Sequence, residues 1–320
     1  MNPCNFTHTT FILVGLPGLE TAQFWIAFPF LSMYVVAVLG NCTVVFIVRT
    51  ENSLHAPMYI FLCMLAAIDL ALSTVTMPKI LALFWFNFQE ITFDMCLTQM
   101  FFIHALSATE STVLLAMAFD RYMAICQPLR HAAVLTNTVT AQIGLVAVVR
   151  GALFFFPFPL LIKRLHFCGS NILTHSYCVH QDMMKLAHAD TMPNVVYGLT
   201  AILLVMGVDA VLISLSYFLI IRTVLQLPSW TERAKAFGTC VLHIVVVLTF
   251  YVPLIGLSVV HRFGNSLNPI VHVLMGNVYL MVPPVINPII YAAKTKQIRS
   301  RVVAMFKITC DKEHQAVGSH

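Results

Sequence analysis

Seven apolar runs, each near the length needed to cross a bilayer, constrain this sequence more than any other feature. A helix rises 1.5 Å per residue, so about 20 apolar residues cross a hydrocarbon core about 30 Å thick. The runs cover residues 24–48, 58–84, 97–120, 140–162, 196–221, 236–260 and 271–292. Helices satisfy their own backbone in lipid, and neighbouring helices compensate for internal prolines. The sequence therefore predicts an all-α membrane protein, a seven-transmembrane helix bundle.

The composition agrees with this fold and excludes an aqueous catalytic domain. Only 10% of the residues are charged and 59% are hydrophobic, whereas soluble chains carry about 25% charged residues. No polar stretch is long enough to fold alone. We therefore expect no enzyme activity and no nucleic-acid partner. The expected organisation is a tail of residues 1–23, a bundle of residues 24–292 and a second tail of residues 293–320.

The distribution of basic residues predicts the orientation. With the N-terminus outside, 12 of the 18 lysines and arginines fall on the cytoplasmic side and 5 outside, with Arg150 left inside the fourth run. This bias is the one expected for an extracellular N-terminus and a cytoplasmic C-terminus. Asn5 begins a glycosylation sequon that fits an outer tail. Residues 292–308 alternate basic and apolar side chains, which predicts a short amphipathic helix on the anionic inner lipids of the plasma membrane.

Several motifs lie within the first, second, third and seventh apolar runs or at their ends. They are GN (40–41), LAAIDLALS (65–73), MAFDRYMAIC (117–126) and PPVINPIIY (283–291). With them the chain resembles a rhodopsin-like G-protein-coupled receptor. The strings LHAPMY (54–59), SY (216–217) and KAFGTC (235–240) resemble the vertebrate olfactory receptor signature. HAPMY, HALSATES and VVHRFG are most similar to class I, fish-like receptors of family 51, subfamily E.

The resemblance implies a role for the motif residues in activation. Arg121 would be held by Asp120 at rest and exposed to a stimulatory, olfactory-type G protein on activation. The G protein would then raise cyclic AMP. The alternative is that Asp120 and Arg121 form a plain interfacial ion pair. A proline and a buried amide in the seventh run form a hinge that can adopt two packings, or a static kink. The full set of coupling candidates is Asp120, Arg121, Tyr122, Tyr217, Asn287, Pro288 and Tyr291.

Two carboxylates lie at the depth of the membrane centre. Asp69 and Glu110 are costly there, so they are expected to face the bundle interior. The resemblance places them near a sodium-type polar cluster, within reach of Asn41 and Asn287. Either they share a sodium ion, or at least one is protonated because two close carboxylates repel when both are ionised. No other cofactor is expected, and Arg150 and Asp209 are expected to form structural polar contacts.

A ligand chamber is predicted at the outer end of the bundle. Tyr251, Ile255, Ser258 and Arg262 are spaced 4, 3 and 4 residues apart, so they share one helical face. His104, Ser107 and Ser111 form a comparable stripe on the third run, with Phe155 and Leu257 as apolar walls. Cys96 and Cys178 both lie on the oxidising side, where a disulfide is plausible. Such a bridge would hold Gln181, three residues further on, above the same space.

The chemistry of this set suits an anion. Residues 97–109 contain no acid, which argues against an amine ligand, whereas arginine grips a carboxylate bidentately. We therefore predict a small carboxylic acid bridging Arg262 and His104, with short chains favoured by the aromatic walls. Arg262 could instead be a helix-end anchor, and His104 an ordinary interior histidine.

Other functions are weaker alternatives. The ligand could be another anion or a lipid. A transporter would use Asp69, Glu110 and Arg150, but the odd number of spans and the missing inverted repeat argue against it. His175, Cys178 and His180 have a weak metal-ligand spacing, which a disulfide at Cys178 would disrupt, so no metal site is expected. Pairing of Cys168 with Cys4 and lipidation of Cys310 stay open.

Overall fold

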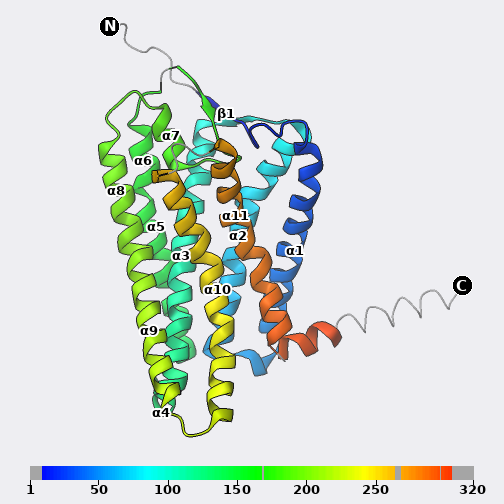
Figure 1. The fold of residues 1–320 in the computed structure, drawn as a ribbon, viewed down its shortest axis with the longest axis vertical. Coiled ribbons are helices and arrows are strands. Elements are labelled where there is room, and N and C mark those ends of the chain that lie inside the picture. The colour runs from blue at the N-terminus through cyan, green and yellow to red at the C-terminus, as the bar shows by residue number, and fades with distance from the viewer. Residues whose placement is uncertain (1–8, 168, 264–267, 296, 305–320) are drawn as a thin grey trace, which may run out of the picture.

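The chain folds into seven membrane-length helical spans that run side by side (Figure 1). The computed structural model describes residues 9–167, 169–263, 268–295 and 297–304, but not the side chains of residues 52, 261–263, 269, 293 and 294. The spans are α1 (Gln23–Thr50), α2 (Pro57–Phe86), α3 (Phe93–Cys126), α5 with α6 (Asn137–Phe155, Pro157–Lys163), α8 with η2 and α9 (Met192–Ile202, Leu203–Gly207, Val208–Leu225), α10 (Trp230–Phe263) and α11 (Pro269–Lys294). Shorter helices are η1 (Asn52–Leu54), α4 (Pro128–Val134) and α7 (His180–Leu186). The predicted seven-helix bundle is confirmed.

Two spans are interrupted, and each interruption has a local cause. The fourth span breaks between α5 and α6, where Pro157 follows Phe156 and supplies no backbone N–H. The fifth span contains η2, a π-helical turn at Leu203–Gly207 that the sequence analysis did not predict. A π turn carries an extra residue and frees backbone carbonyls from the regular ladder. Those carbonyls need hydrogen-bond donors from outside the helix backbone.

A three-stranded sheet covers one end of the bundle, called the sheet end below. The strands β1 (Thr10–Leu13), β2 (Glu90–Thr92) and β3 (Ile172–Leu173) lie in the order β2-β1-β3. β1 is antiparallel to β2 and parallel to β3. The sequence analysis expected a plain tail here, but Phe11 and Leu13 alternate with the half-buried Thr10 and Ile12 and are themselves fully buried. The ring of Phe11 packs on Phe93 at 5.9 Å and on Phe167 at 5.6 Å, which fixes the strand.

The opposite end, called the C-terminal end, carries the predicted amphipathic helix. Residues 297–304 are helical. Ile298 is fully buried against the bundle, and the exposed Arg301 makes a 2.6 Å ion pair with Glu51. The apolar face therefore packs inward and the basic face outward, as the pattern predicts. The rest of the predicted tail, including Cys310, lies outside the described residues.

Candidate functional site

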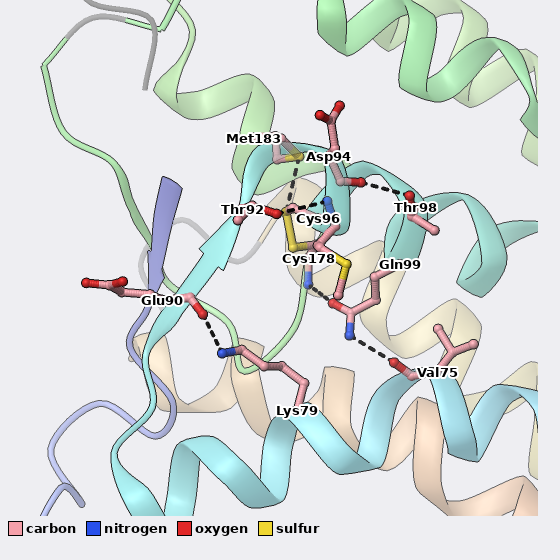
Figure 2. Close-up of a disulfide and its surroundings, with 11 residues drawn as sticks. Val75, Lys79, Glu90, Thr92, Asp94, Cys96, Thr98, Gln99, Cys178 and Met183 are labelled. Atoms are coloured by element: carbon pink, nitrogen blue, oxygen red, sulfur yellow. Dashed lines mark hydrogen bonds between the residues drawn. A yellow bond between two sulfur atoms is a disulfide. The ribbon is translucent and has the colours of Figure 1, made fainter. Parts of the chain in front are cut away.

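The disulfide ties the loop before α7 to the start of α3. Cys96 and Cys178 are bonded, with their Cα atoms 5.4 Å apart (Figure 2), so the predicted bridge is confirmed. The backbone N–H of Cys178 donates to Gln99 Oε1 at 3.0 Å, and Gln99 Nε2 donates to the Val75 carbonyl at 3.1 Å. The loop is thereby linked to α3 and α2. This attachment holds the following helix, α7, at the sheet end of the bundle.

A buried carboxylate gives α7 a second attachment. Asp182 accepts a hydrogen bond from Thr174 Oγ1 at 2.8 Å, contacts the His175 ring and lies 3.4 Å from Lys185 Nζ. Burial alone would raise the pKa of this carboxyl. Hydrogen bonds from His175 and Thr174, with the charges of His175 and Lys185, instead hold its pKa well below the usual range. The ionised carboxylate therefore stabilises α7.

Beneath α7 lies a cavity of about 350 Å³, called the polar chamber. Its size is typical of small-ligand sites, which span roughly 300–1,000 Å³. The lining residues are His104, Phe158, His180, Gln181, Met184, Lys185, Thr191, Asn194, Val195, Gly198, Leu199, Ile202 and Ser258. Three predicted ligand residues, His104, Gln181 and Ser258, are thus brought together from α3, α7 and α10.

Stacked rings fix the wall around His104. The His104 ring stacks on Phe155 at 5.5 Å and meets Phe158 at 5.1 Å, and Phe158 in turn stacks on His180 at 4.6 Å. His180 Nε2 is buried, with no hydrogen-bond partner among the described residues. Burial lowers the pKa of His180 to about 4, so its ring is neutral near pH 7. The sequence analysis did not place His180 at this chamber, although it directly precedes Gln181 on the same tethered segment.

The other predicted ligand residues lie elsewhere. Phe155 is fully buried behind His104, and Leu257 is half-buried against the core. Ser107 and Ser111 are fully buried in α3 and do not line the chamber in the described part. Tyr251 and Ile255 line a separate cavity between the fifth span and α10. Arg262 belongs to the last turn of α10, but its side chain lies outside the described residues, as does all of Asn5.

Ser111 and Tyr251 belong to a buried polar network centred on Asp209. Arg150 Nη1 donates to Asp209 Oδ2 at 2.8 Å, and Ser111 Oγ donates to the same oxygen at 2.8 Å. Ser111 Oγ also lies 2.8 Å from the Tyr251 hydroxyl. Arg150 Nη2 donates to the Val205 carbonyl at 3.0 Å, which satisfies a carbonyl of the π turn. The network links α3, α5, α9 and α10, and it supports the structural role expected for Arg150 and Asp209.

The polar core holds unpaired oxygens. Asn287 Nδ2 donates to Asp69 Oδ2 at 3.0 Å, which joins α11 to α2. Asp69 Oδ1, Glu110 Oε1 and Asn287 Oδ1 are buried without a hydrogen-bond partner in the described part of the chain. Oxygen donors of this kind suit a hard cation such as sodium. Asn41 instead donates to the carbonyls of Ala37 and Pro284, each at 2.9 Å, and so connects α1 to α11.

The coupling candidates gather at the C-terminal end. Arg121 makes a 3.2 Å ion pair with Asp120, and His131 Nε2 lies 2.8 Å from the other Asp120 oxygen. Arg121 lines a cavity of about 210 Å³ together with His243 and Tyr291. His243 Nδ1 lies 2.5 Å from the Tyr217 hydroxyl, and the Tyr122 hydroxyl accepts from Gln127.

The seventh span, α11, is a continuous helix with Pro288 inside it, and it packs closely on α1. A Cβ added at Gly40 would lie 2.9 Å from the Pro288 ring, so only glycine fits at that contact. Pro288 is therefore seated against α1, next to Asn287 of the polar core.

A membrane bundle of seven helices with this Asp–Arg pair, proline-containing last span and disulfide-tethered loop defines the rhodopsin-like class of G-protein-coupled receptors. Squid rhodopsin has the same fold: the two structures superpose with a TM-score of 0.74 over 97% of this chain and 92% of that one, at 16% sequence identity. A model of the olfactory receptor family matches residues 30–309. The chain therefore belongs to the olfactory receptor family.

Close relatives place it in family 51. Human Olfactory receptor 51E2 is 81% identical over 99% of both chains, and the mouse Olfactory receptor 51E2 is 80% identical over the full length of both. Human Olfactory receptor 51E1 is 61% identical over 94% of each chain. The protein is thus a multi-pass membrane receptor and not an enzyme, and its fold implies a G-protein partner and a small-molecule ligand.

Proposed function

We propose that this receptor senses small carboxylic acids in the polar chamber and signals through a stimulatory, olfactory-type G protein to cyclic AMP. The observation that carries the proposal is the composition of the chamber wall. His104, Gln181 and Ser258 supply hydrogen-bonding groups, and no carboxylate lines the chamber among the described residues. Ser258 lies one helical turn before Arg262 on α10. His104 and Gln181 would supply hydrogen-bond donors to an anion, and Ser258 marks the side of the chamber nearest the sequence position of the permanent cation Arg262.

The mechanism follows from differential affinity. The carboxylate bridges Arg262 on α10 and His104 on α3 more tightly when the sheet end of α10 moves inward, and the ligand thereby favours that state. Tyr251 and Ser111 join the same two helices deeper in the bundle. Movement of α10 is thus transmitted toward the C-terminal end. There it would release Arg121 from Asp120 and open the groove for the G protein.

The orientation in the plasma membrane is part of this proposal. The sheet end, with its disulfide, faces the extracellular side, where disulfides persist. The C-terminal end, with most of the basic residues, faces the cytoplasm. The basic face of residues 297–304 would then contact anionic lipids of the inner leaflet. This orientation opens the polar chamber toward external ligands.

The cyclic AMP response is expected to weaken when the ligand loses its negative charge or when the receptor loses Arg262 or His104. We expect propanoic acid, but not methyl propanoate, to raise cyclic AMP in cells that express the receptor. Hydrogen bonds to charged groups contribute about 1.5–3 kcal/mol, so Arg262→Ala and His104→Ala should each raise the half-maximal concentration roughly 10- to 100-fold. Lys163→Ala and His188→Ala, which change residues outside the chamber lining, are the matched controls at equal surface expression. An ester as potent as the acid would overturn the proposal.

We also propose a sodium ion between Asp69, Glu110 and Asn287, supported by their three unpaired buried oxygens. Sodium at ten times its dissociation constant should stabilise the receptor by about 1.4 kcal/mol. The unfolding temperature of purified receptor should therefore be higher in sodium chloride than in potassium chloride. Glu110→Gln should abolish the difference, and Glu90→Gln, at an exposed position, should retain it. Equal unfolding temperatures in the two salts would favour the alternative, in which Asp69 or Glu110 is protonated and no sodium binds.

A further inference from the structure

A second cavity of about 270 Å³ lies between the fifth span and α10, and we call it the lipid-side cavity. Its walls are apolar and come from both spans: Leu203, Met206, Ala210, Leu254, Ile255 and Val259. Leu203 and Ile255 are each 57% exposed, which places them on the membrane-facing surface of the bundle. No charged side chain lines this cavity in the part of the chain that the structure describes.

The two cavities share a boundary. Ile202 and Ser258 line both the polar chamber and the lipid-side cavity. Ser258 Oγ donates to the Leu254 carbonyl at 2.9 Å, so its hydroxyl is held on α10 at this boundary. The hydrogen-bonding groups His104 and Gln181 line only the chamber. The cavity on one side of this boundary is thus polar, and the cavity on the other side is apolar and faces lipid.

The π turn forms the wall of the lipid-side cavity on the fifth span. Leu203, Met206 and Gly207 all belong to this turn and to the cavity lining. Arg150 donates to the carbonyls of Leu204 and Val205, which stabilises the turn. π turns occur often at functional sites. The widened helix therefore supports a preformed apolar surface beside the chamber.

The polarity of the two adjoining cavities matches an amphipathic anion. We propose that the lipid-side cavity is an acyl-chain subsite, which takes the tail of carboxylic acids that are too long for the polar chamber alone. The inference rests on the proposed function, because the carboxylate stays in the chamber. Tyr251 and Ile255, which the sequence analysis assigned to ligand binding, then contact the tail. Each methylene transferred from water into the subsite should improve affinity roughly fourfold.

The test uses full-length receptor in lipid nanodiscs and decanoic acid that carries a diazirine near its terminal carbon. After irradiation, we expect covalent adducts on the fifth span and α10 at Leu203, Met206, Ile255 or Val259. Ala210→Phe fills the subsite and should reduce these adducts at least tenfold, while propanoic acid still stimulates nucleotide exchange on the G protein. Val211→Phe is the matched control, because Val211 is 67% exposed and lies outside both cavities. Ile255→Trp fills the same space from an exposed position if Ala210→Phe folds poorly.

The outcomes separate the two proposals. Adducts confined to chamber residues such as His104, Phe158 and Gln181 would overturn the subsite and leave the carboxylate chamber standing. Equal subsite labelling in native receptor and in both filling variants would also overturn it. The methyl ester of the probe should label the receptor weakly. An ester that labels the subsite as strongly as the acid would overturn the proposed function, and the inference with it.

Discussion

Replacement of Asp209 with asparagine is expected to destabilise the receptor by about 3–5 kcal/mol, the usual effect of breaking a buried ion pair. The Asp209 side chain is 2% exposed and that of Arg150 is 22% exposed, so neither can simply turn to water. A guanidinium cannot shed its proton. The variant therefore leaves an uncompensated cation inside the bundle. The measurement is the unfolding temperature of purified receptor, with surface expression as a second readout.

Loss of the partner, Arg150, should destabilise the receptor less than loss of Asp209. In Arg150→Met the remaining carboxyl keeps the hydrogen bonds that Ser111 and Thr112 donate to it, which offset part of the loss. The double variant Arg150→Met with Asp209→Asn removes both charges and should recover much of the lost stability, because apolar replacements of buried pairs are often neutral. Glu90→Gln, at an exposed position, is a control for loss of one acid. Additive effects of the two single changes would contradict a direct interaction.

Most of the fold could be predicted from the sequence because lipid imposes a simple rule. Each span must satisfy its own backbone over a fixed thickness, and seven runs of suitable length therefore give seven helices. The sheet end could not be predicted in the same way. β1 contributes only four residues, and its partners β2 and β3 lie far apart in the sequence. Its stability comes from rings such as Phe93 and Phe167 that the fold brings together.

The site was predicted in part for a comparable reason. The sequence analysis grouped His104, Gln181 and Ser258 from helix-face spacing and a predicted disulfide, and all three line the polar chamber. Spacing alone could not show that the face of α10 divides between two cavities. Ser258 lines the polar chamber, whereas Tyr251 lines only the lipid-side cavity. That division depends on the π turn in the fifth span, and no residue pattern in Leu203–Gly207 indicated it.

Loss of the disulfide is expected to affect both stability and ligand response. Cys96 and Cys178 close a loop with a sequence separation of 82 residues, and removal of a native disulfide typically costs about 2–5 kcal/mol. We expect Cys96→Ser with Cys178→Ser to lower the unfolding temperature. A reductant should lower the unfolding temperature of native receptor but not that of this double variant. Cys240→Ser, which changes a buried free cysteine, should retain the response of native receptor to reductant.

The ligand response of the same double variant tests what the tether does for the chamber. The interactions of Asp182 with Thr174 and Lys185 do not depend on the disulfide, so α7 should still form. The hydrogen bond between the backbone of residue 178 and Gln99 would remain, without the covalent link to α3. Gln181 and His180 would then be held less firmly over His104. We therefore expect the half-maximal concentration of propanoic acid to rise even among receptors that reach the cell surface. An unchanged value at reduced expression would show that the disulfide stabilises the fold without positioning the chamber.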